Sequence, residues 1–311
     1  MIEIKCNKLN QDLVSIIVIT YNSSKYILET LDSIKSQTYK NIELVVSDDC
    51  SSDTTVEICK SWLNDNSDCF FRTELIASPQ NTGVAHNCNQ GSKASHGKWL
   101  KFIAGDDKLF PEAITEFVHF VIVNNCKICC CKMKLFGEDE YLISINDKYF
   151  DKSYKEINKD LEHQRKLILN EQFIPAPGLF FSRELFDSVG GFDEEYQFCE
   201  DWPFLFKVLK SGNKGHLINK YLVYYRIYND SLTSSLRCFN DVKKFFYNER
   251  LHLLLKGGHL LLIWHLYLYY LYKTLWWKVN RYSFLSILVK GFLVFSPLSY
   301  IHIFKKYIYD A

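Results

Sequence analysis

The sequence predicts an α/β fold, in which a mostly parallel sheet is flanked by helices and followed by a helical C-terminal region. Three observations support this prediction. Short β-branched apolar runs alternate with segments of helical periodicity up to residue 107. Polar clusters follow the ends of these runs, which is the edge where parallel sheets bind ligands. Beyond residue 240 the alternation stops and the sequence becomes helical and aromatic.

Continuous apolar runs indicate the strands, because a parallel strand is covered on both faces. These runs are Val14–Thr20, Asn41–Ser47, Glu74–Ala77 and Lys98–Ile103. The spacing of apolar residues between these strands predicts helices at Tyr26–Ser36 and Ser52–Asp65, and a loop that enters a helix over 81–95. We expect Ser23 or Ser24 to cap the first helix and Asp53 to cap the second, because short polar side chains accept hydrogen bonds there.

The second half of the chain continues with fewer strands. Lys127–Phe136 predicts a buried strand, and helices are expected at Arg183–Val189 and Asp201–Ser211 with a Gly-Gly break between them. Residues 138–172 are polar with little periodicity, so we interpret them as a candidate mobile segment over a site. The β-α alternation as a whole favours helices on both sides of the sheet.

Composition and charge exclude several classes of protein. The chain has 311 residues, of which 48% are hydrophobic and 23% charged, so it is neither disordered nor collagen-like. Its net charge of +1 excludes bulk electrostatic attraction to nucleic acid. This charge is unevenly distributed, since residues 1–242 hold 27 Lys and Arg against 34 Asp and Glu (−7), and residues 243–311 hold 10 against 2 (+8).

The basic, aromatic tail predicts a separate region at 241–311, after an α/β domain at 1–240. Gly257–Tyr272 is uncharged but too short to span a membrane, and Tyr282–Phe304 is interrupted by Lys290 and Pro297. We therefore predict helices that lie in the plane of a membrane surface. The alternative is that they pack on the catalytic domain or on a second subunit in a homo-oligomer.

The eleven cysteines do not form a recognisable framework. Cys126 and Cys129 have CxxC spacing, but no second CxxC or His pair completes a zinc site, so we interpret this cluster as apolar core. Abundant free thiols indicate a reducing cytoplasm. The opening residues 1–12 have no apolar run of the kind found in signal peptides.

Six motifs occur in a characteristic order: VSIIVITYN (14–22), ELVVSDDCSSD (43–53), NTG (81–83), HGKWLKFIAGDD (96–107), GGFDE (190–194) and CEDWPFLFKV (199–208). This set resembles the inverting glycosyltransferases of family 2, which have the GT-A (nucleotide-diphospho-sugar transferase) fold. It is most similar to bacterial enzymes that build O-antigen or capsule repeat units. The resemblance covers roughly residues 13–235 and implies a donor half at about 13–110 and an acceptor half at about 111–240.

The resemblance implies a divalent cation, Mn²⁺ or Mg²⁺, at the donor diphosphate. Oxygen ligands suit such a cation, and Asp106 and Asp107 at a strand end could supply them. Family members usually have Asp-x-Asp-Asp here, whereas this chain has Ala104 in the first position. Asp106 is therefore the leading metal ligand, and the alternative is a charged turn that closes a strand.

The resemblance also implies a set of donor-binding residues. Asp48 and Asp49 match carboxylates that bind the uridine of a UDP-sugar, and the first loop lines the nucleobase pocket with Thr20, Tyr21 and Asn22. Tyr21 would stack on the base or fill the sheet edge. The remaining donor-binding positions are Asn81, Gly83 and Arg226.

Three departures from the family concern this donor site. Cys88 stands where many relatives have Arg, and Tyr228 stands where they often have His. Arg226 could replace the missing cation, or it could form a salt bridge inside the fold. Gly83 would allow the backbone to approach the nucleotide.

Catalysis is assigned by matching the family's Glu-Asp motif. Inverting transfer needs one base to take the proton of the acceptor hydroxyl. The match gives this role to Asp201 at a helix start, with Glu200 as the alternative base or an acceptor contact. Trp202 and Gly191 are expected to form the acceptor side. The alternative is that both acids only stabilise the start of the helix.

The resulting expectation is transfer of a hexose from a UDP-sugar to a lipid-diphosphate-linked saccharide at the cytoplasmic face of the bacterial inner membrane. The lipid acceptor follows from the resemblance and from the tail. A nucleotidyltransferase is one alternative, but no basic Gly-rich triphosphate loop is evident. A second alternative is a degenerate nucleotide-sugar-binding scaffold, because the chain departs from the family at Ala104, Cys88 and Tyr228.

Overall fold

The computed structural model describes residues 12–171, 173–228 and 236–278. The chain divides into two compact units, residues 1–234 and 235–311. This division falls a few residues ahead of position 240, where the sequence predicts the domain boundary. The separation of the first domain into donor and acceptor halves stays a prediction.

The first unit is built on one sheet of eight strands. Their order is β3-β2-β1-β4-β7-β6-β8-β5, with parallel pairing among the first four and between β6 and β8. Antiparallel pairing joins β7 to both neighbours and β5 to β8. The strands are β1 Val14–Thr20, β2 Ile42–Asp48, β3 Arg72–Ala77, β4 Trp99–Ala104, β5 Lys108–Leu109, β6 Ile128–Gly137, β7 Leu179–Ser182 and β8 Leu217–Ile227. The mostly parallel sheet flanked by helices is confirmed.

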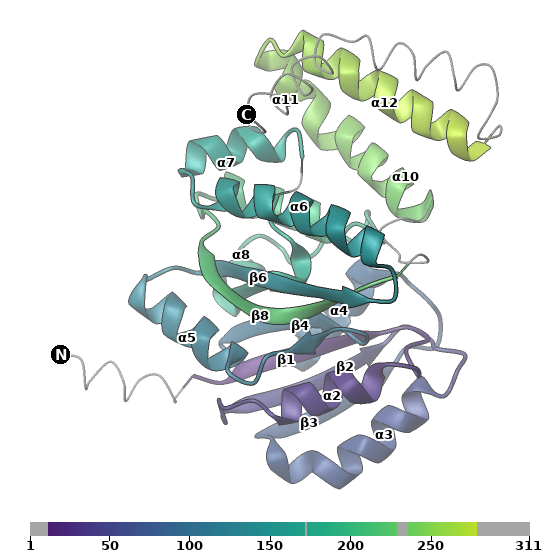
Figure 1. Cartoon of the computed structure of the whole chain (residues 1–311), viewed down its shortest axis with the longest axis vertical. Coiled ribbons are helices and arrows are strands. Elements are labelled where there is room, and N and C mark those ends of the chain that lie inside the picture. The colour runs from purple at the N-terminus through teal and green to yellow at the C-terminus, as the bar shows by residue number, and fades with distance from the viewer. Residues whose placement is uncertain (1–11, 172, 229–235, 279–311) are drawn as a thin grey trace. The chain divides into compact units, whose positions relative to one another are not determined.

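Helices cover both faces of this sheet (Figure 1). They are α2 Ile27–Lys35, α3 Thr55–Asn66, α4 Val84–Ala94, α5 Ala113–Val123, α6 Glu140–Ile157, α7 Leu161–Ile168, α8 Arg183–Ser188 and α9 Asp201–Lys210. Val14, Ile16 and Val18 of β1 share one buried cluster with α2, α3 and α5. Ile17 points to the opposite face, where it meets α4 at Gly91 so closely that a Cβ there would lie 2.5 Å from its side chain. The alternation of faces along β1 thus fixes which helices lie on which side.

The two predicted helix caps have different outcomes. Asp53 accepts a hydrogen bond from the Thr55 N–H at 3.0 Å in the first turn of α3, although Thr54 occupies the N-cap position. The prediction for α2 is wrong, because neither serine side chain caps this helix. Tyr26 occupies the N-cap position, and the Ser23 carbonyl accepts the Tyr26 and Ile27 N–H groups. The serine contributes its backbone rather than its hydroxyl.

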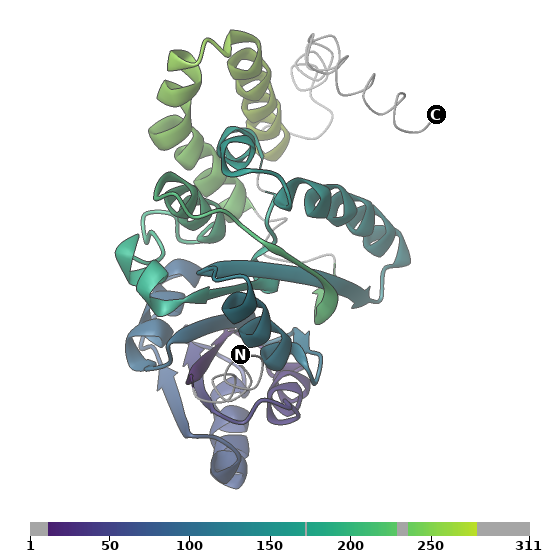
Figure 2. The same cartoon turned by 90° about the vertical axis from the view of Figure 1, so that its left-hand side faces the viewer.

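The polar segment 138–172 is mostly helical over its described residues, although its sequence shows little periodicity, and its mobility stays a prediction. α6 begins after Asp139, which accepts the Leu142 N–H, and α7 begins after Asp160, which accepts the His163 N–H. α6 packs along β6, and α7 packs against α9 (Figure 1 and Figure 2). Polar residues dominate because each helix buries only a narrow stripe.

The cysteine cluster lies on β6, as the sequence predicts. Cys129, Cys130 and Cys131 are buried in this strand. Burial raises the pKa of each thiol, so the neutral form persists at neutral pH. These residues therefore pack as small apolar groups.

The second unit is helical over its described part. It contains α10 Leu236–Phe245, a π-helical turn at Phe246–Arg250, α11 Leu251–Lys256 and α12 Leu260–Lys278. The ring of Tyr270 on α12 packs against Phe239 and Phe246, with centroids 6.0 and 5.1 Å apart. Among the described residues, no helix combines the length and hydropathy needed to cross a membrane. The predicted segment Tyr282–Phe304 lies outside the described residues.

Candidate active site

The carboxyl ends of β1, β2 and β4 meet at one edge of the sheet, because their registers coincide. Thr20 lies level with Asp48, and Ile19 lies level with Ala104. Hydrogen bonds continue past the strands, with the Asp49 N–H donating to Thr20 at 2.9 Å and the Gly105 N–H donating to Ile19 at 2.9 Å. This edge therefore brings together three polar segments that are far apart in sequence.

Gly105 is required at this edge by close packing. A Cβ on this residue would lie 2.9 Å from the Thr20 methyl group and 3.0 Å from the Ser23 hydroxyl. The loop that carries Asp106 can consequently approach the first loop without a side chain between them. Beside it, Ala104 is exposed, so the position of the absent carboxylate is open.

Asp48 is buried and has a structural task, and its role as a direct donor ligand stays a prediction. One oxygen accepts bonds from the hydroxyls of Thr20 at 2.7 Å and Ser51 at 2.5 Å. The other accepts the Ser51 N–H at 2.8 Å. Thr20 is likewise buried, and its hydroxyl is used by Asp48. The pair ties the first loop to the second.

Asp49 connects the second loop to the segment at 81–83. Its Oδ1 accepts the N–H and hydroxyl of Thr82 at 2.8 and 3.0 Å, and its Oδ2 accepts the Gly83 N–H at 2.9 Å. Oδ2 accepts this one recorded bond, and a carboxylate oxygen can accept two. Asp49 therefore retains capacity for a ligand N–H or hydroxyl, and Asn81 lies exposed on the same segment.

Gly83 packs against protein, which differs from the expected approach to a nucleotide. Its φ is +94°, and a Cβ would lie 2.8 Å from the Gln197 side chain and 3.0 Å from the Gln197 carbonyl. The same carbonyl accepts the Ala85 N–H at 3.2 Å. The glycine thus joins the donor-side segment to the loop that precedes α9.

The first loop presents an exposed aromatic ring. Tyr21 is 52% exposed. Asn22 has a φ of +50°, and its side-chain oxygen accepts the Ser52 N–H at 2.8 Å, so this residue shapes the loop. The exposure of Tyr21 favours stacking on a ligand over filling of the sheet edge, and its contact with a donor stays a prediction.

Asp106 and Asp107 form a strained electrostatic pair. Burial raises the pKa of both carboxyls, and the charge of Asp106 raises that of Asp107 further. Asp107 is fully buried, with one oxygen accepting the Arg226 N–H at 2.9 Å. Its second oxygen is buried without a partner among the described residues. The Tyr228 hydroxyl donates to Asp106 Oδ2 at 2.9 Å.

This pair fits a divalent cation. Hard oxygen ligands are those that Mg²⁺ and Mn²⁺ prefer, and a bound cation would relieve the cost of two adjacent ionised carboxyls. Among the residues that the structure describes, no three His, Cys, Asp or Glu side chains come together as a metal cluster. A cation here would consequently take further ligands from a bound diphosphate or from water.

Arg226 is committed to the fold, which favours the salt-bridge interpretation over donor binding. Its Nε donates to the Asp106 carbonyl at 2.9 Å, and its terminal nitrogen pairs with Glu29 at 3.1 Å. The guanidinium carbon lies 3.9 Å from the Tyr26 ring centroid and 4.3 Å from that of Phe136. Stacking between two rings holds the cation in place.

Glu200 and Asp201 stand at the start of α9. Burial and the charge of Asp201 raise the pKa of Glu200 to about 8. Asp201 accepts the Trp202 N–H at 2.7 Å. The buried Cys88 thiol feels the charges of Glu200, Asp201 and Asp49, each of which raises its pKa beyond the effect of burial. The predicted catalytic pair and the predicted donor-binding carboxylate Asp49 therefore lie around the same side chain.

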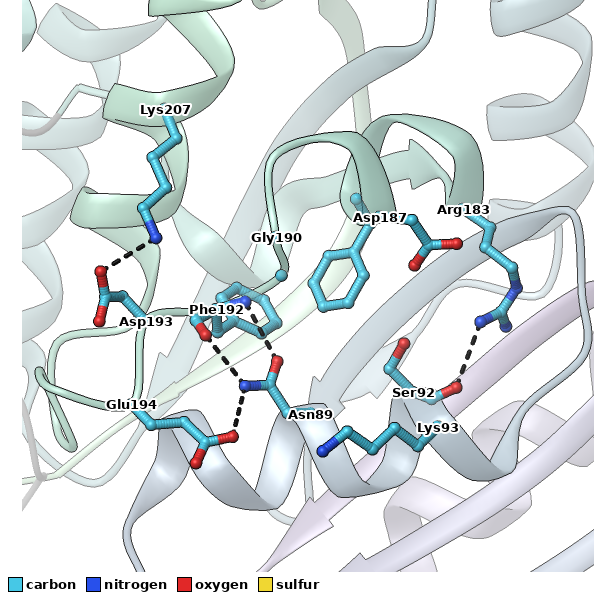
Figure 3. Close-up of a pocket in the computed structure, with 12 residues that line it drawn as sticks. Asn89, Ser92, Lys93, Arg183, Asp187, Gly190, Phe192, Asp193, Glu194 and Lys207 are labelled. Atoms are coloured by element: carbon cyan, nitrogen blue, oxygen red, sulfur yellow. Dashed lines mark hydrogen bonds and ion pairs between the residues drawn. The ribbon is translucent and has the colours of Figure 1, made fainter.

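The two predicted acceptor residues differ in their surroundings, and the acceptor role of Gly191 stays a prediction. Trp202 is only 8% exposed, and its indole donates to the Ile168 carbonyl at 2.9 Å, so it packs between α9 and α7 rather than forming an acceptor wall. Gly191 lines a cavity of about 490 Å³ along α4 (Figure 3). Its φ is +68°, and a Cβ would lie 3.0 Å from the Asn89 oxygen. Asn89 in turn donates to Phe192 and Glu194.

Sequence reasoning missed three residues that organise the site. Ser51 and Thr82 hold the two aspartates, and both lie inside motifs that were identified for their neighbours. Gln197, which contacts Gly83, lies in no motif and carried no signal in the sequence.

The comparisons identify the family. The model of Glycosyl transferase family 2 matches residues 15–190. The chain belongs to this family. An uncharacterised glycosyltransferase of Rickettsia typhi is 30% identical over 200 residues, which are 64% of this chain and 59% of that protein. Glycosyltransferase GlyA of Streptococcus pneumoniae is 30% identical over 230 residues, 72% of this chain and 32% of that protein. The chain thus spans less than two thirds of these relatives.

Solved structures confirm the GT-A fold that the sequence predicts. S. aureus TarS 1-349 in complex with UDP-GlcNAc superposes with a TM-score of 0.56 at 22% identity, covering 75% of this chain and 65% of that chain. Mannosyltransferase PcManGT from Pyrobaculum calidifontis, in complex with GDP-Man and Mn²⁺, gives 0.56 at 19% identity, covering 74% and 62%. At such identities the likeness shows the fold alone.

The raised pKa of Glu200 predicts a pH-dependent stability. The folded carboxyl keeps its proton up to about pH 8, whereas the unfolded chain loses it near its ordinary pKa. The free energy of unfolding should therefore fall between these values, and Glu200→Gln should remove this contribution. Denaturant titrations at pH 5 and 8.5 measure it, with the exposed Glu57→Gln as the control. Parallel pH dependences for wild type and Glu200→Gln would contradict the assignment.

Proposed function

We propose that the protein is an inverting, metal-dependent glycosyltransferase that moves a hexose from a UDP-sugar to a lipid-diphosphate-linked saccharide during synthesis of a surface polysaccharide. One observation carries this proposal. Asp49 holds Gly83, Gly83 packs against Gln197, and Gln197 leads into Glu200 and Asp201. A carboxylate suited to a nucleotide is thereby joined to a pair of acids suited to catalysis.

The choice of UDP-sugar as donor has two supports. The motifs in the first two loops resemble uridine-binding members of the family. TarS, which shares the fold, is described in complexes with UDP-GlcNAc and with UDP. Asp49 has acceptor capacity for the nucleobase or ribose, and Tyr21 offers an exposed ring for stacking.

The chemistry follows from the states of the two acids. The raised pKa of Glu200 favours Asp201 as the base that takes the acceptor's hydroxyl proton. The acceptor oxygen bonds to the anomeric carbon as the bond to UDP breaks, and one displacement inverts that carbon. A cation held by Asp106 and Asp107 would offset the charge of the departing diphosphate.

We propose that the protein binds its acceptor at a membrane surface. The residues 243–311 carry a balance of +8, and α12 exposes large apolar side chains. Trp264 is 54% exposed and stacks on Tyr267, with centroids 6.3 Å apart. Aromatic rings beside basic residues suit the headgroup level of an anionic bilayer, here the cytoplasmic face of a bacterial inner membrane.

A degenerate nucleotide-sugar-binding scaffold is the second candidate. The specific observation in its favour is that the Tyr228 hydroxyl already donates a hydrogen bond to Asp106. In addition, Ala104 stands where family members usually have a further carboxylate. Hydrolysis or transfer of the donor by the pure protein separates an enzyme from such a scaffold.

Asp106→Asn tests the donor site. The amide keeps the size of the side chain but removes the charge that would hold a cation, so Mn²⁺-dependent UDP binding should weaken and transfer should nearly disappear. Folding stability should not fall, because burial already disfavours the ionised form. Calorimetric UDP titrations with and without Mn²⁺ measure this, with the exposed Asp65→Asn as control. Turnover equal to wild type would refute the assignment.

Asp201→Asn tests the base. Loss of base catalysis costs on the order of 10²–10⁴-fold in kcat, while UDP affinity should stay within a few-fold, since this residue does not hold the nucleotide. Glu200→Gln copies the protonated state and should lose less. If Glu200→Gln is inactive while Asp201→Asn turns over, the roles are reversed.

Trp264→Ala tests the membrane surface. Removal of an exposed indole should reduce binding of the full chain to vesicles that contain anionic lipid, with no effect on UDP binding. Co-sedimentation with such vesicles measures the change, and Tyr141→Ala, at an exposed aromatic of α6, is the control. Equal binding of both variants and the wild type would contradict an α12 contact.

A further inference from the structure

Tyr228 covers the carboxylate that the proposed function assigns to the cation. It directly follows β8, is 38% exposed, and donates its hydroxyl to Asp106 Oδ2 at 2.9 Å. Hydrogen bonds to a charged acceptor are the stronger ones in proteins. The contact therefore stabilises Asp106 while no ligand is present.

The end of β8 is fixed in a way that places this hydroxyl. The Arg226 N–H binds Asp107, and the Arg226 side chain binds the Asp106 carbonyl. The guanidinium is stacked between Tyr26 and Phe136. Tyr228 lies two residues beyond this anchor, so its position over Asp106 is set by the fold rather than by a chance side-chain encounter.

A cation and this hydroxyl compete for the same oxygen. Mg²⁺ binds carboxylate oxygens at roughly 2.1 Å, whereas the phenol oxygen lies 2.9 Å from Oδ2 with its proton directed at the carboxylate. A cation on that side would meet the phenol oxygen and its proton. We propose that Tyr228 is a hydroxyl cap on Asp106, which a divalent cation must displace as the donor diphosphate binds.

This cap rests on the proposed donor site, and it would regulate how tightly that site binds a cation. A cation that approaches Oδ2 from the side of Tyr228 must break this hydrogen bond first, so the cap lowers cation affinity. A hydrogen bond to a charged group corresponds to about tenfold or more in an equilibrium constant. Nucleotide binding without a cation should not depend on the cap. Within the described residues, Tyr228 forms no hydrogen bond with Asp49 or with the first loop.

The test compares three full-length proteins: wild type, Tyr228→Phe and Tyr221→Phe. Tyr221 is a matched control, since it is an exposed tyrosine on β8, which Tyr228 directly follows. Mn²⁺ is titrated at saturating UDP, and free Mn²⁺ is followed by electron paramagnetic resonance. We expect Tyr228→Phe to bind Mn²⁺ about tenfold more tightly, with Tyr221→Phe equal to wild type. UDP affinity without cation should be the same in all three.

Each other outcome overturns the cap. Unchanged Mn²⁺ affinity in Tyr228→Phe would show that the hydroxyl does not compete, and weaker affinity would show that it supports cation binding. In both cases the donor site itself would stand, because wild type binds Mn²⁺ with UDP. If none of the three proteins binds Mn²⁺ with UDP, the cation site of the proposed function fails together with its cap.

Discussion

The buried carboxylate of Asp48 is the constraint on which the site depends. It ends β2 level with Thr20 at the end of β1, and it binds both Thr20 and the turn at Ser51. A buried charge of this kind is tolerated only when its oxygens are satisfied. The first and second loops are consequently held in fixed positions relative to each other. From the second loop, Asp49 accepts hydrogen bonds from Thr82 and Gly83.

Direct contacts connect Asp49 to the loop that carries Glu200 and Asp201, the proposed catalytic acids. Gly83 has no side chain, so its backbone lies against Gln197, and this contact holds the loop before α9. The φ of +94° at Gly83 would strain any other residue. The proposed donor-binding segment and the loop before α9 thus meet through a single glycine, although they lie more than 100 residues apart in the sequence. Pre-organisation of this type is what a displacement reaction needs.

The strands could be predicted from the sequence, because continuous β-branched runs have few other uses; the predicted Val14–Thr20 coincides with β1. Helices α6 and α7 were missed because their apolar stripes are narrow, although Asp139 and Asp160 were available as cap signals. Motifs located Arg226 and Trp202 at the site but could not tell which way the side chains face. Both turn inward, Arg226 to Glu29 and two rings, Trp202 to Ile168. Burial depends on tertiary partners that a motif does not specify.

The electrostatics of the site follow from residues that are neutral where a charge would be expected. Cys88 lies among Asp49, Glu200 and Asp201, and burial keeps its thiol protonated. An arginine in this place would offer a positive charge to all three carboxyls and would lower the pKa of Glu200. With a neutral thiol instead, burial and the charge of Asp201 raise the pKa of Glu200 to about 8, against a smaller lowering by a backbone hydrogen bond. Cys88 therefore supplies no positive charge that would lower the pKa of Glu200, which agrees with the proposal that Asp201 is the base.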